Sequence, residues 1–263
     1  MKKFQVKYNK KDYTKIIDKV RMKIKKYGFC ILKEFNSEKT HAKIYDQIKK
    51  KYKKGSDIKY TGEHSLKSKD FQRLDVGNSF QNARFMRVIS FFEWNKRNKK
   101  IFELIKPIIK IRNDLSKIEK KENYYPNVKT ISKKNNKNKI HADFVRMIQY
   151  PLGGGFLQEH SDYTKHYAKK VFGLIVPITF NLTNKNTKSK KYQAYKVGGL
   201  YYKLKKKNIL TDDFTSVGDL IFFDPKKKHG VKSIQPNSPL DLNKLNGRIT
   251  LAFSVSNFQK KNN

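Results

Sequence analysis

The sequence predicts an α+β protein in which N-terminal helices pack outside a β core of the sandwich or jelly-roll kind. Two patterns indicate this. Residues 13–26, 36–54 and 101–118 carry apolar side chains at helical spacing, whereas short alternating segments between Gly, Pro and Asn turns follow from about residue 140. Because the helices precede the strands instead of alternating with them, we expect them outside one largely antiparallel core.

Three segments in the first half of the chain have helical periodicity. Gly28 ends the first, and Asn36 or Ser37 can cap the second. Pro107 predicts a kink or a late start in the third. The expected helices are residues 13–26, residues 36–54 with Ala42, Tyr45 and Ile48 on one face, and residues 101–118.

Short apolar runs and polar connectors separate these helices. Residues 29–32 have strand character, and residues 85–94 are typical of a strand or of the start of the next helix. Residues 55–82 are polar with few apolar anchors, which predicts a long loop of the kind that often forms a lid. Residues 120–139 form a charged, Asn-rich connector.

The second half of the chain contains the expected β core. Its strands are short, and Gly and Pro turns separate them, as in sandwiches and jelly rolls. We treat residues 1–263 as one domain, with residues 1–139 as a mostly helical flank with a lid loop and residues 140–257 as the core. The expected strands are residues 144–150, 172–180, 199–204, 219–223, 231–234 and 248–255, the last after an Asn246-Gly247 turn.

The net charge of +39 has two explanations. A strongly basic chain is typical of nucleic-acid-binding proteins or of enzymes that attract anionic substrates. However, 53 of the basic residues are Lys and only eight are Arg, and the Lys are spread through the whole chain. Bidentate phosphate recognition favours Arg. We therefore favour an AT-rich coding composition as the origin of the charge, with nucleic-acid binding as the alternative.

The single Cys30 excludes an internal disulfide and a Cys-based zinc site. No run of about 18 apolar residues predicts a transmembrane helix. No apolar segment follows the basic residues at the start of the chain, so a secretory signal is not expected. We expect a cytoplasmic protein without a membrane partner.

The chemistry is expected at His160 and Asp162, which follow a glycine-rich turn. At i and i+2 they lie on one face of a strand. His229 follows 67 residues later, and two imidazoles with one carboxylate form the facial triad of non-haem Fe(II) oxygenases. His141 and Asp143 repeat the same pattern. We prefer His160 because a strand and a glycine turn precede it and the remaining strands follow, and we interpret His141 as a surface or capping residue.

Arg248 and Thr250 share a face of the last predicted strand. A guanidinium and a hydroxyl placed in this way can bind one carboxylate together. A buried Arg at the start of an apolar strand also needs an anionic partner. We therefore expect a carboxylate ligand at this point.

These segments, in this order, resemble the Fe(II)/2-oxoglutarate-dependent dioxygenase superfamily, of the prolyl-hydroxylase and phytanoyl-CoA-hydroxylase type. The resemblance covers residues 140–257. One departure is the stretch between His229 and Arg248, which at 19 residues is longer than is usual in the family. The matching segments are Arg146-Met147-Ile148-Gln149-Tyr150-Pro151 with its glycine turn, His160-Ser161-Asp162, Gly198-Gly199-Leu200, Gly218-Asp219-Leu220-Ile221-Phe222-Phe223, His229-Gly230-Val231 and Arg248-Ile249-Thr250.

The resemblance implies a double-stranded β-helix, a jelly-roll or cupin-like core. It also implies Fe(II) held by His160, Asp162 and His229, with 2-oxoglutarate as co-substrate on Arg248 and Thr250. Arg146 and Tyr150 are expected either to contact the co-substrate or to form the cavity wall.

The implied reaction oxidatively decarboxylates 2-oxoglutarate to succinate and CO₂ while hydroxylating, or otherwise oxidising, an unidentified substrate. That substrate is a small molecule or a protein side chain, and the basic composition favours an anionic one. The alternatives are a non-catalytic, basic nucleic-acid-binding protein on a cupin-like barrel and a metal-dependent isomerase or lyase. Candidate substrate contacts, each with an equally good structural explanation, are residues 70–82, Glu159, Tyr163, His166 and Tyr201.

Overall fold

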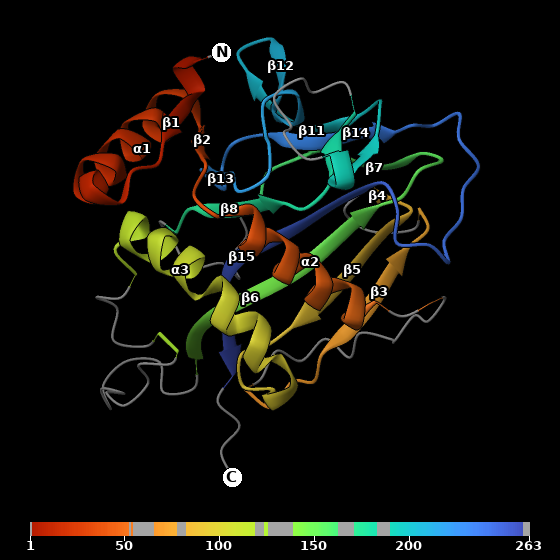
Figure 1. Cartoon of the computed structure of the whole chain (residues 1–263), viewed down its shortest axis with the longest axis horizontal. Coiled ribbons are helices and arrows are strands. Elements are labelled where there is room, and N and C mark those ends of the chain that lie inside the picture. Colours follow the sequence, from red (N-terminus) through yellow and green to blue (C-terminus); the bar gives the residue numbers. More distant parts are fainter. Residues whose placement is uncertain are drawn as a thin grey trace.

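The computed structural model describes residues 2–52, 54, 66–77, 83–118, 124–125, 139–162, 171–182 and 190–259. Two β-sheets and three α-helices make up most of this part of the chain (Figure 1). The helices are α1 (Tyr13–Tyr27), α2 (Glu38–Lys51) and α3 (Lys99–Ser116). No helix among these residues is long and apolar enough to span a bilayer.

The larger sheet has eight strands, and its centre is antiparallel. β15 pairs with β6 over twelve residues on one side and with β8 on the other. A parallel pair, β1 with β2, forms one edge. In spatial order the strands are β1 (Gln5–Lys7), β2 (Phe29–Lys33), β13 (Leu220–Phe223), β8 (Gly173–Pro177), β15 (Arg248–Gln259), β6 (Lys139–Tyr150), β5 (Met86–Phe91) and β3 (Phe71–Asp75).

The smaller sheet has five antiparallel strands that carry much of the chemistry. In spatial order the strands of this sheet are β12 (Lys207–Leu210), β11 (Gly199–Leu204), β14 (His229–Ile234), β7 (Gly155–His160) and β4 (Ala83–Arg84). A separate two-stranded pair, β9 (Phe180–Asn181) with β10 (Gln193–Tyr195), completes the β structure of the described residues.

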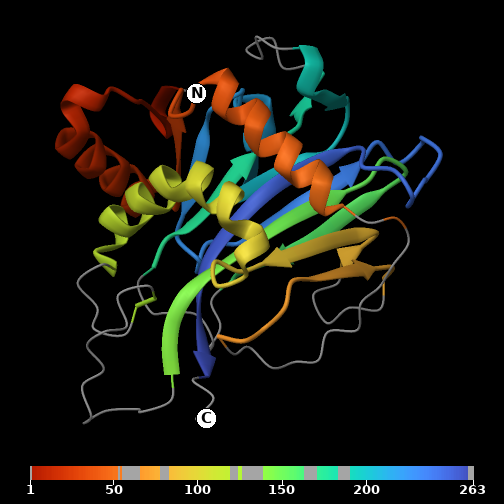
Figure 2. The same cartoon turned by 60° about the horizontal axis from the view of Figure 1, so that its bottom comes forward.

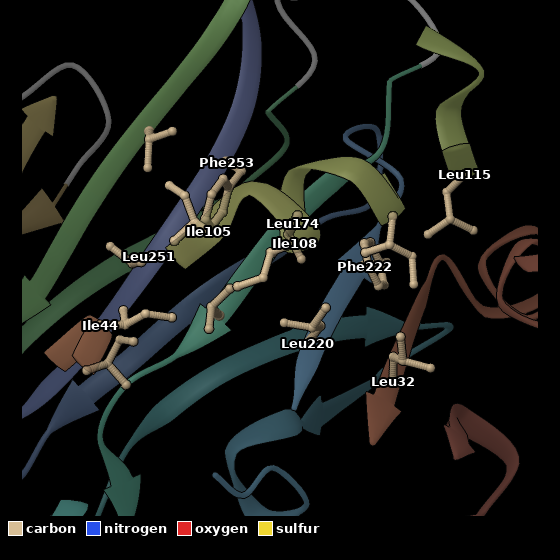
Figure 3. Packing of buried hydrophobic residues seen from close by; sticks show 14 of the residues in the cluster. Leu32, Ile44, Ile105, Ile108, Leu115, Leu174, Leu220, Phe222, Leu251 and Phe253 are labelled. Atoms are coloured by element: carbon tan, nitrogen blue, oxygen red, sulfur yellow. The ribbon is translucent and has the colours of Figure 1, made fainter. Parts of the chain in front are cut away.

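All three helices cover one face of the larger sheet, as Figure 2 shows for α2 and α3 lying across β15 and β6. Their amphipathic faces supply the contacts. Ile105 and Ile108 of α3 point towards Leu174, Leu251 and Phe253 of the sheet (Figure 3), and all five side chains are buried. This layer confirms the predicted α+β class with helices outside a jelly-roll core.

A second hydrophobic cluster lies between the two sheets. It includes Tyr150, Ile175, Leu200 and Val231, so the inner faces of both sheets are apolar at their centre. The two clusters lie on opposite faces of the larger sheet, which explains why strands such as β8 and β13 are buried at every position.

The N-terminal half of the chain contributes more strands than the sequence predicted. Residues 71–75, expected within a long loop, form strand β3 at the edge of the larger sheet, and residues 86–91 form β5 between β3 and β6. Burial decides this, because Gln72 of the polar segment is buried against β5. The rest of the expected lid, residues 55–65 and 78–82, lies outside the described residues, as does most of the 120–139 connector.

The helix boundaries agree with the expected capping residues. Ser37 accepts a hydrogen bond from the Thr40 N–H at the start of α2, and Gly28, with a φ of 84°, ends α1. Pro107 lies inside α3 without ending it. The buried face of α2 differs from the prediction, since His41, Ile44 and Ile48 are buried whereas Ala42 and Tyr45 are half-buried.

Replacing Ile108 with Ala should lower the free energy of unfolding by about 2–5 kcal/mol, because the side chain is fully buried between α3 and the sheet. Chemical denaturation would measure the change. Met22→Ala is the control, since Met22 is 63% exposed and its loss should change stability by less than about 0.5 kcal/mol. Equal effects of the two substitutions would contradict the packing described for α3.

Candidate metal centre and substrate cavity

Two histidines meet at the edge where β7 ends and β14 begins. His160 is the last residue of β7, His229 is the first of β14, and the antiparallel register places them directly opposite each other. Their ring centroids are 4.4 Å apart. The sheet register therefore brings together two side chains that are 69 residues apart in the sequence.

Asp162 completes the group two residues after β7 ends. Its Oδ1 is 3.2 Å from Nε2 of His160, and its Oδ2 is 3.8 Å from Nε2 of His229. One ligand atom from each of the three residues lies within 4.8 Å of the other two. The structure thus brings together the three predicted ligands, and their spacing suits a single metal ion.

Backbone carbonyls hold both imidazoles in orientations that suit a metal. Nδ1 of His160 lies 2.9 Å from the Gln158 carbonyl oxygen, and Nδ1 of His229 lies 2.8 Å from that of Lys227. A carbonyl can only accept, so each Nδ1 carries the proton, and Nε2 of the neutral ring keeps a lone pair directed at the site. Two such nitrogens beside a carboxylate fit a divalent cation, and two His with one carboxylate are the ligands of non-haem Fe(II).

The charges of the three residues favour a positive group between them. Burial lowers the pKa of the His160 imidazole, but its hydrogen bond with Asp162 and the charge of Asp162 raise it overall, so a proton holds this pair together where a metal would replace it. Burial raises the pKa of Asp162, but its hydrogen bond with His160 and the two neighbouring imidazoles lower it overall, to about 2. Burial lowers the pKa of His229, which keeps that ring neutral. Asp162 therefore stays ionised and His229 stays a lone-pair donor at neutral pH.

A cavity between the two sheets opens beside these ligands, with an empty volume of about 920 Å³ including its mouth. All seven residues expected at the site line this cavity: His160, Asp162, His229, Arg248, Thr250, Arg146 and Tyr150.

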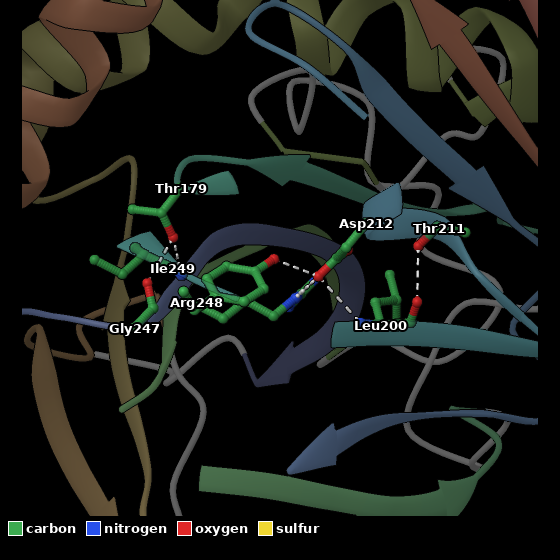
Figure 4. Close-up of polar contacts among 8 residues, drawn as sticks. Thr179, Leu200, Thr211, Asp212, Gly247, Arg248 and Ile249 are labelled. Atoms are coloured by element: carbon green, nitrogen blue, oxygen red, sulfur yellow. Dashed lines mark hydrogen bonds and ion pairs between the residues drawn. The ribbon is translucent and has the colours of Figure 1, made fainter. Parts of the chain in front are cut away.

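Arg248 is buried, as predicted, but part of its charge is already paired. Its Nε donates to Oδ2 of Asp212 at 2.6 Å and its Nη2 donates to Oδ1 at 3.2 Å (Figure 4). Tyr195 also donates to Asp212. A buried Arg was expected to need an anionic partner, and Asp212, which was not among the predicted residues, supplies one. Nη1 takes no part in this ion pair.

Backbone geometry explains how Asp212 reaches Arg248. Asp212 lies in the short 3₁₀ helix Thr211–Asp213, and it accepts the Leu200 N–H at 3.2 Å. Gly199 has a φ of 127°, and a Cβ there would lie 2.6 Å from Oδ2 of Asp212. The glycine pair that precedes β11 therefore leaves room for the carboxylate, a role that becomes visible only in three dimensions.

His141 and Asp143 do not form a metal site. Asp143 is buried and pairs with the buried Arg112, and it accepts a further hydrogen bond from Tyr124. The geometry therefore favours His160 over His141 as a candidate metal ligand, as the sequence did. Asp143 instead joins β6 to α3 through an internal ion pair.

Few of the candidate substrate contacts lie at the cavity. Glu159 pairs with Lys203 and Lys228, and neither Glu159 nor Tyr201 lines the cavity. Tyr163 and His166 lie outside the described residues. Within residues 70–82, Arg73 lines the cavity, although no local pattern had singled out this residue.

No family model and no curated protein matches the sequence. Solved structures, however, share its architecture. One is a Pseudomonas putida prolyl-4-hydroxylase, which is 10% identical with a TM-score of 0.51, covering 92% of this chain and 98% of that one. Another is the non-haem α-ketoglutarate-dependent epimerase SnoN of nogalamycin biosynthesis, at 6% identity and a TM-score of 0.55, covering 92% and 83%.

A third is the Arabidopsis thaliana dioxygenase for auxin oxidation in a binary complex with 2-oxoglutarate, at 10% identity and a TM-score of 0.53, covering 96% and 91%. The chain has the fold of the 2-oxoglutarate-dependent oxygenases. The predicted resemblance is thus confirmed for the architecture, which is a double-stranded β-helix with flanking helices. At identities this low, the structural similarity establishes the fold alone. The reaction has to be argued from the residues of the site.

Asp162→Asn should abolish tight binding of Fe(II), or of Mn(II) as a stand-in, and should destabilise the protein less than a buried substitution does, because its pairs with His160 and His229 are partly exposed. Asp143→Asn, the matched substitution at the second His-x-Asp pattern, should keep metal binding but destabilise the fold. It leaves the buried Arg112 without its ionised partner, which costs about 3–5 kcal/mol. Metal titration by calorimetry and chemical denaturation test both. Loss of metal binding in Asp143→Asn alone would refute the assignment.

Asp212→Asn should also destabilise the protein by about 3–5 kcal/mol, because it leaves the buried Arg248 uncompensated. Saturating 2-oxoglutarate should restore more stability to this variant than it adds to the wild type, since the ligand then supplies the missing carboxylate. Denaturation with and without 2-oxoglutarate measures the difference. An equal ligand effect on both proteins would place the 2-oxoglutarate carboxylate away from Arg248.

Proposed function

We propose that this protein is an Fe(II)- and 2-oxoglutarate-dependent dioxygenase that hydroxylates, or otherwise oxidises, an organic substrate. One observation carries the proposal. Two imidazoles and a carboxylate meet with their ligand atoms within 4.8 Å, and a buried arginine and threonine line the same cavity. The oxygenase fold of the chain supports it, and a protein with that fold has been solved with 2-oxoglutarate bound.

His160, Asp162 and His229 would hold the metal. When bound there, Fe(II) supplies the redox chemistry that couples decarboxylation of 2-oxoglutarate, giving succinate and CO₂, to oxidation of a substrate by dioxygen. Three protein ligands leave coordination positions for the 2-oxo acid and for dioxygen. The carbonyls of Gln158 and Lys227 fix the rings so that the ligand set is formed in advance.

Arg248 and Thr250 would bind the distal carboxylate of 2-oxoglutarate. Both side chains are buried, they lie two residues apart on β15, and both line the cavity. Asp212 fixes the plane of the guanidinium through Nε and Nη2, so Nη1 needs no reorganisation to donate to a ligand. The Thr250 hydroxyl has no hydrogen-bond partner among the described residues. Tyr150 is paired with Arg248 across β6 and β15 and joins this end of the site.

Apolar side chains form most of the remaining wall between these groups. Ile148, Leu157, Leu174 and Val231 lie around the cavity and limit the access of water. A water-poor site strengthens the interaction of the carboxylate with Arg248 and protects reactive species from side reactions. The polar groups are therefore few and directed, as in most small-molecule sites.

Similar structures include a prolyl-4-hydroxylase, an epimerase and an auxin dioxygenase. The same fold thus hosts different reactions on different substrates. We propose a small molecule or a protein side chain as the substrate of this chain.

Purified protein supplied with Fe(II) and dioxygen should convert 2-oxoglutarate to succinate slowly even without its substrate. His160→Ala should abolish this turnover. Succinate is quantified by mass spectrometry, and Asp143→Asn, which leaves the metal ligands intact, serves as the active control. Absence of succinate from a protein shown to bind Fe(II) and 2-oxoglutarate would refute the oxygenase proposal.

Thr250→Val should weaken 2-oxoglutarate binding about tenfold with little change in stability, since it removes one hydrogen bond without leaving a buried charge unpaired. Calorimetry under anaerobic conditions measures the affinity. Arg248→Ala should weaken it further but also destabilises the fold through Asp212. A metal-dependent isomerase or lyase would show no 2-oxoglutarate affinity for either substitution to reduce.

A further inference from the structure

The geometry points to a second oxyanion site in the same cavity, formed by Arg73 and Arg146, and we propose that it binds a carboxylate or phosphate group of the oxidised substrate. This inference rests on the proposed dioxygenase function and narrows the substrate to an anionic one. Both side chains line the cavity beside the metal ligands. Neither is needed to explain binding of iron or of 2-oxoglutarate.

The cations that line the cavity are arginines in a chain whose basic residues are mostly lysines. Lys outnumbers Arg 53 to eight in the chain, yet the cations that line the cavity among the described residues are Arg73, Arg146 and Arg248, with no Lys. A random basic residue in this chain would be Lys. Arg offers the planar fork that binds carboxylate and phosphate oxygens in pairs.

Arg73 and Arg146 lack the acceptors that the buried arginines have. Among the described residues, Arg87 donates to Gln149 and Leu242, Arg112 pairs with Asp143, and Arg248 pairs with Asp212, although Nε of Arg87 and Nη1 of Arg112 have no partner. The half-buried Arg73 and Arg146 form no ion pair there, and Nε of each is buried without a hydrogen-bond partner. An anionic ligand would supply acceptors to both guanidiniums.

Neither of the carboxylates near Arg73 and Arg146 forms an ion pair with them. Asp162 is close enough for Arg146 to lower its pKa, but it belongs to the proposed metal ligands. Asp75 lies two residues beyond Arg73 on β3. Its Oδ1 accepts the Gly77 N–H, its Oδ2 is buried without a hydrogen-bond partner, and the residue does not line the cavity. When a divalent metal occupies the site, Asp162 is neutralised by it and the two guanidiniums remain without counter-ions.

The sheet register shows that both side chains can reach one anion. Arg73 lies in the register row of Val88, Ile148 and Thr250. Arg146 is two residues from Ile148 on the same face of β6. Two strand spacings and two residue rises place the two Cα atoms about 12 Å apart, a gap that two extended Arg side chains can close on a shared ligand. The Phe144 ring, 4.9 Å from the Arg146 guanidinium carbon, steadies that side chain.

Arg146 is displaced along the sheet from the Arg248 end of the cavity. Arg146 is opposite Ala252, whereas Tyr150 is opposite Arg248. Four residues along β15 correspond to about 13 Å, so the backbone of Arg146 lies well beyond that of Arg248, and the register row of Thr250 and Arg73 lies between them. Arg146, expected from the sequence to contact the co-substrate or form the wall, is therefore better placed for a second ligand.

The test uses the protein with Fe(II) and 2-oxoglutarate bound under anaerobic conditions, so that nothing turns over. Calorimetric titrations compare phenylacetate and phenyl phosphate with the uncharged phenylacetamide. We expect both oxyanions to bind at least about tenfold more tightly than the amide, because charge-assisted hydrogen bonds to the arginines are lost with the amide. The preferred oxyanion then indicates a carboxylate or a phosphate substrate.

The Arg73→Gln/Arg146→Gln double variant should reduce this preference to less than about twofold and leave 2-oxoglutarate affinity unchanged. Its thermal midpoint should stay the same or rise, since the arginines have no partners to lose. Arg97→Gln removes an exposed charge outside the cavity and is the control for net charge.

Three results would overturn the inference: equal affinity of the wild type for acids and amide, a preference that survives the double substitution, or a fall in 2-oxoglutarate affinity like that of Thr250→Val. A midpoint lowered as much as in Asp212→Asn would mark the arginines as structural and count against it too. Failure of the dioxygenase proposal is seen separately, as absence of 2-oxoglutarate binding or succinate, and the titrations can then be run with metal alone.

Discussion

The pairing of His229 with His160 across β14 and β7 is the constraint on which the site depends. In an antiparallel ladder a slip of one residue sends a side chain to the opposite face of the sheet, so only one register presents both imidazoles to the cavity. The ladder between β7 and β14 is irregular beyond this pair, and the next partners are Val231 and Leu157. Such an irregularity changes the direction of the strand end. Asp162 lies beyond the paired residues, and its carboxylate contacts both imidazoles.

The three candidate metal ligands could be picked out from the sequence because each carries a local signal. His160 and Asp162 have the spacing of a strand end after a glycine turn, and His229 follows a buried apolar strand, Leu220–Phe223. The helices could also be predicted, from the spacing of their apolar residues and from their capping residues. Strand β3 was not, because its segment Phe71–Asp75 is polar and becomes a strand only by pairing with β5. Tertiary pairing overrides local propensity there.

Asp212 and Arg73 could not be found from the sequence for a related reason. Asp212 lies in an Asp-Asp pair in a polar turn, and nothing in its neighbours shows that Gly199 clears a path to Arg248. Arg73 resembles any surface cation until β3 is placed at the sheet edge with its side chain turned inwards. Both cases need the relative position of segments far apart in the chain, which a single sequence does not encode in a readable local pattern.

The net charge of +39 has two components, which differ in where the Lys and Arg side chains lie in the structure. Among the described residues, no Lys side chain is fully buried, while Arg87, Arg112 and Arg248 are. Lys fills the solvated faces, where any cation serves, and Arg is kept where planar donors must match fixed acceptors. A coding bias towards Lys explains the first group but not the second. The arginines that line the cavity without an ion pair, Arg73 and Arg146, are the part of the charge on which the proposed anion site depends.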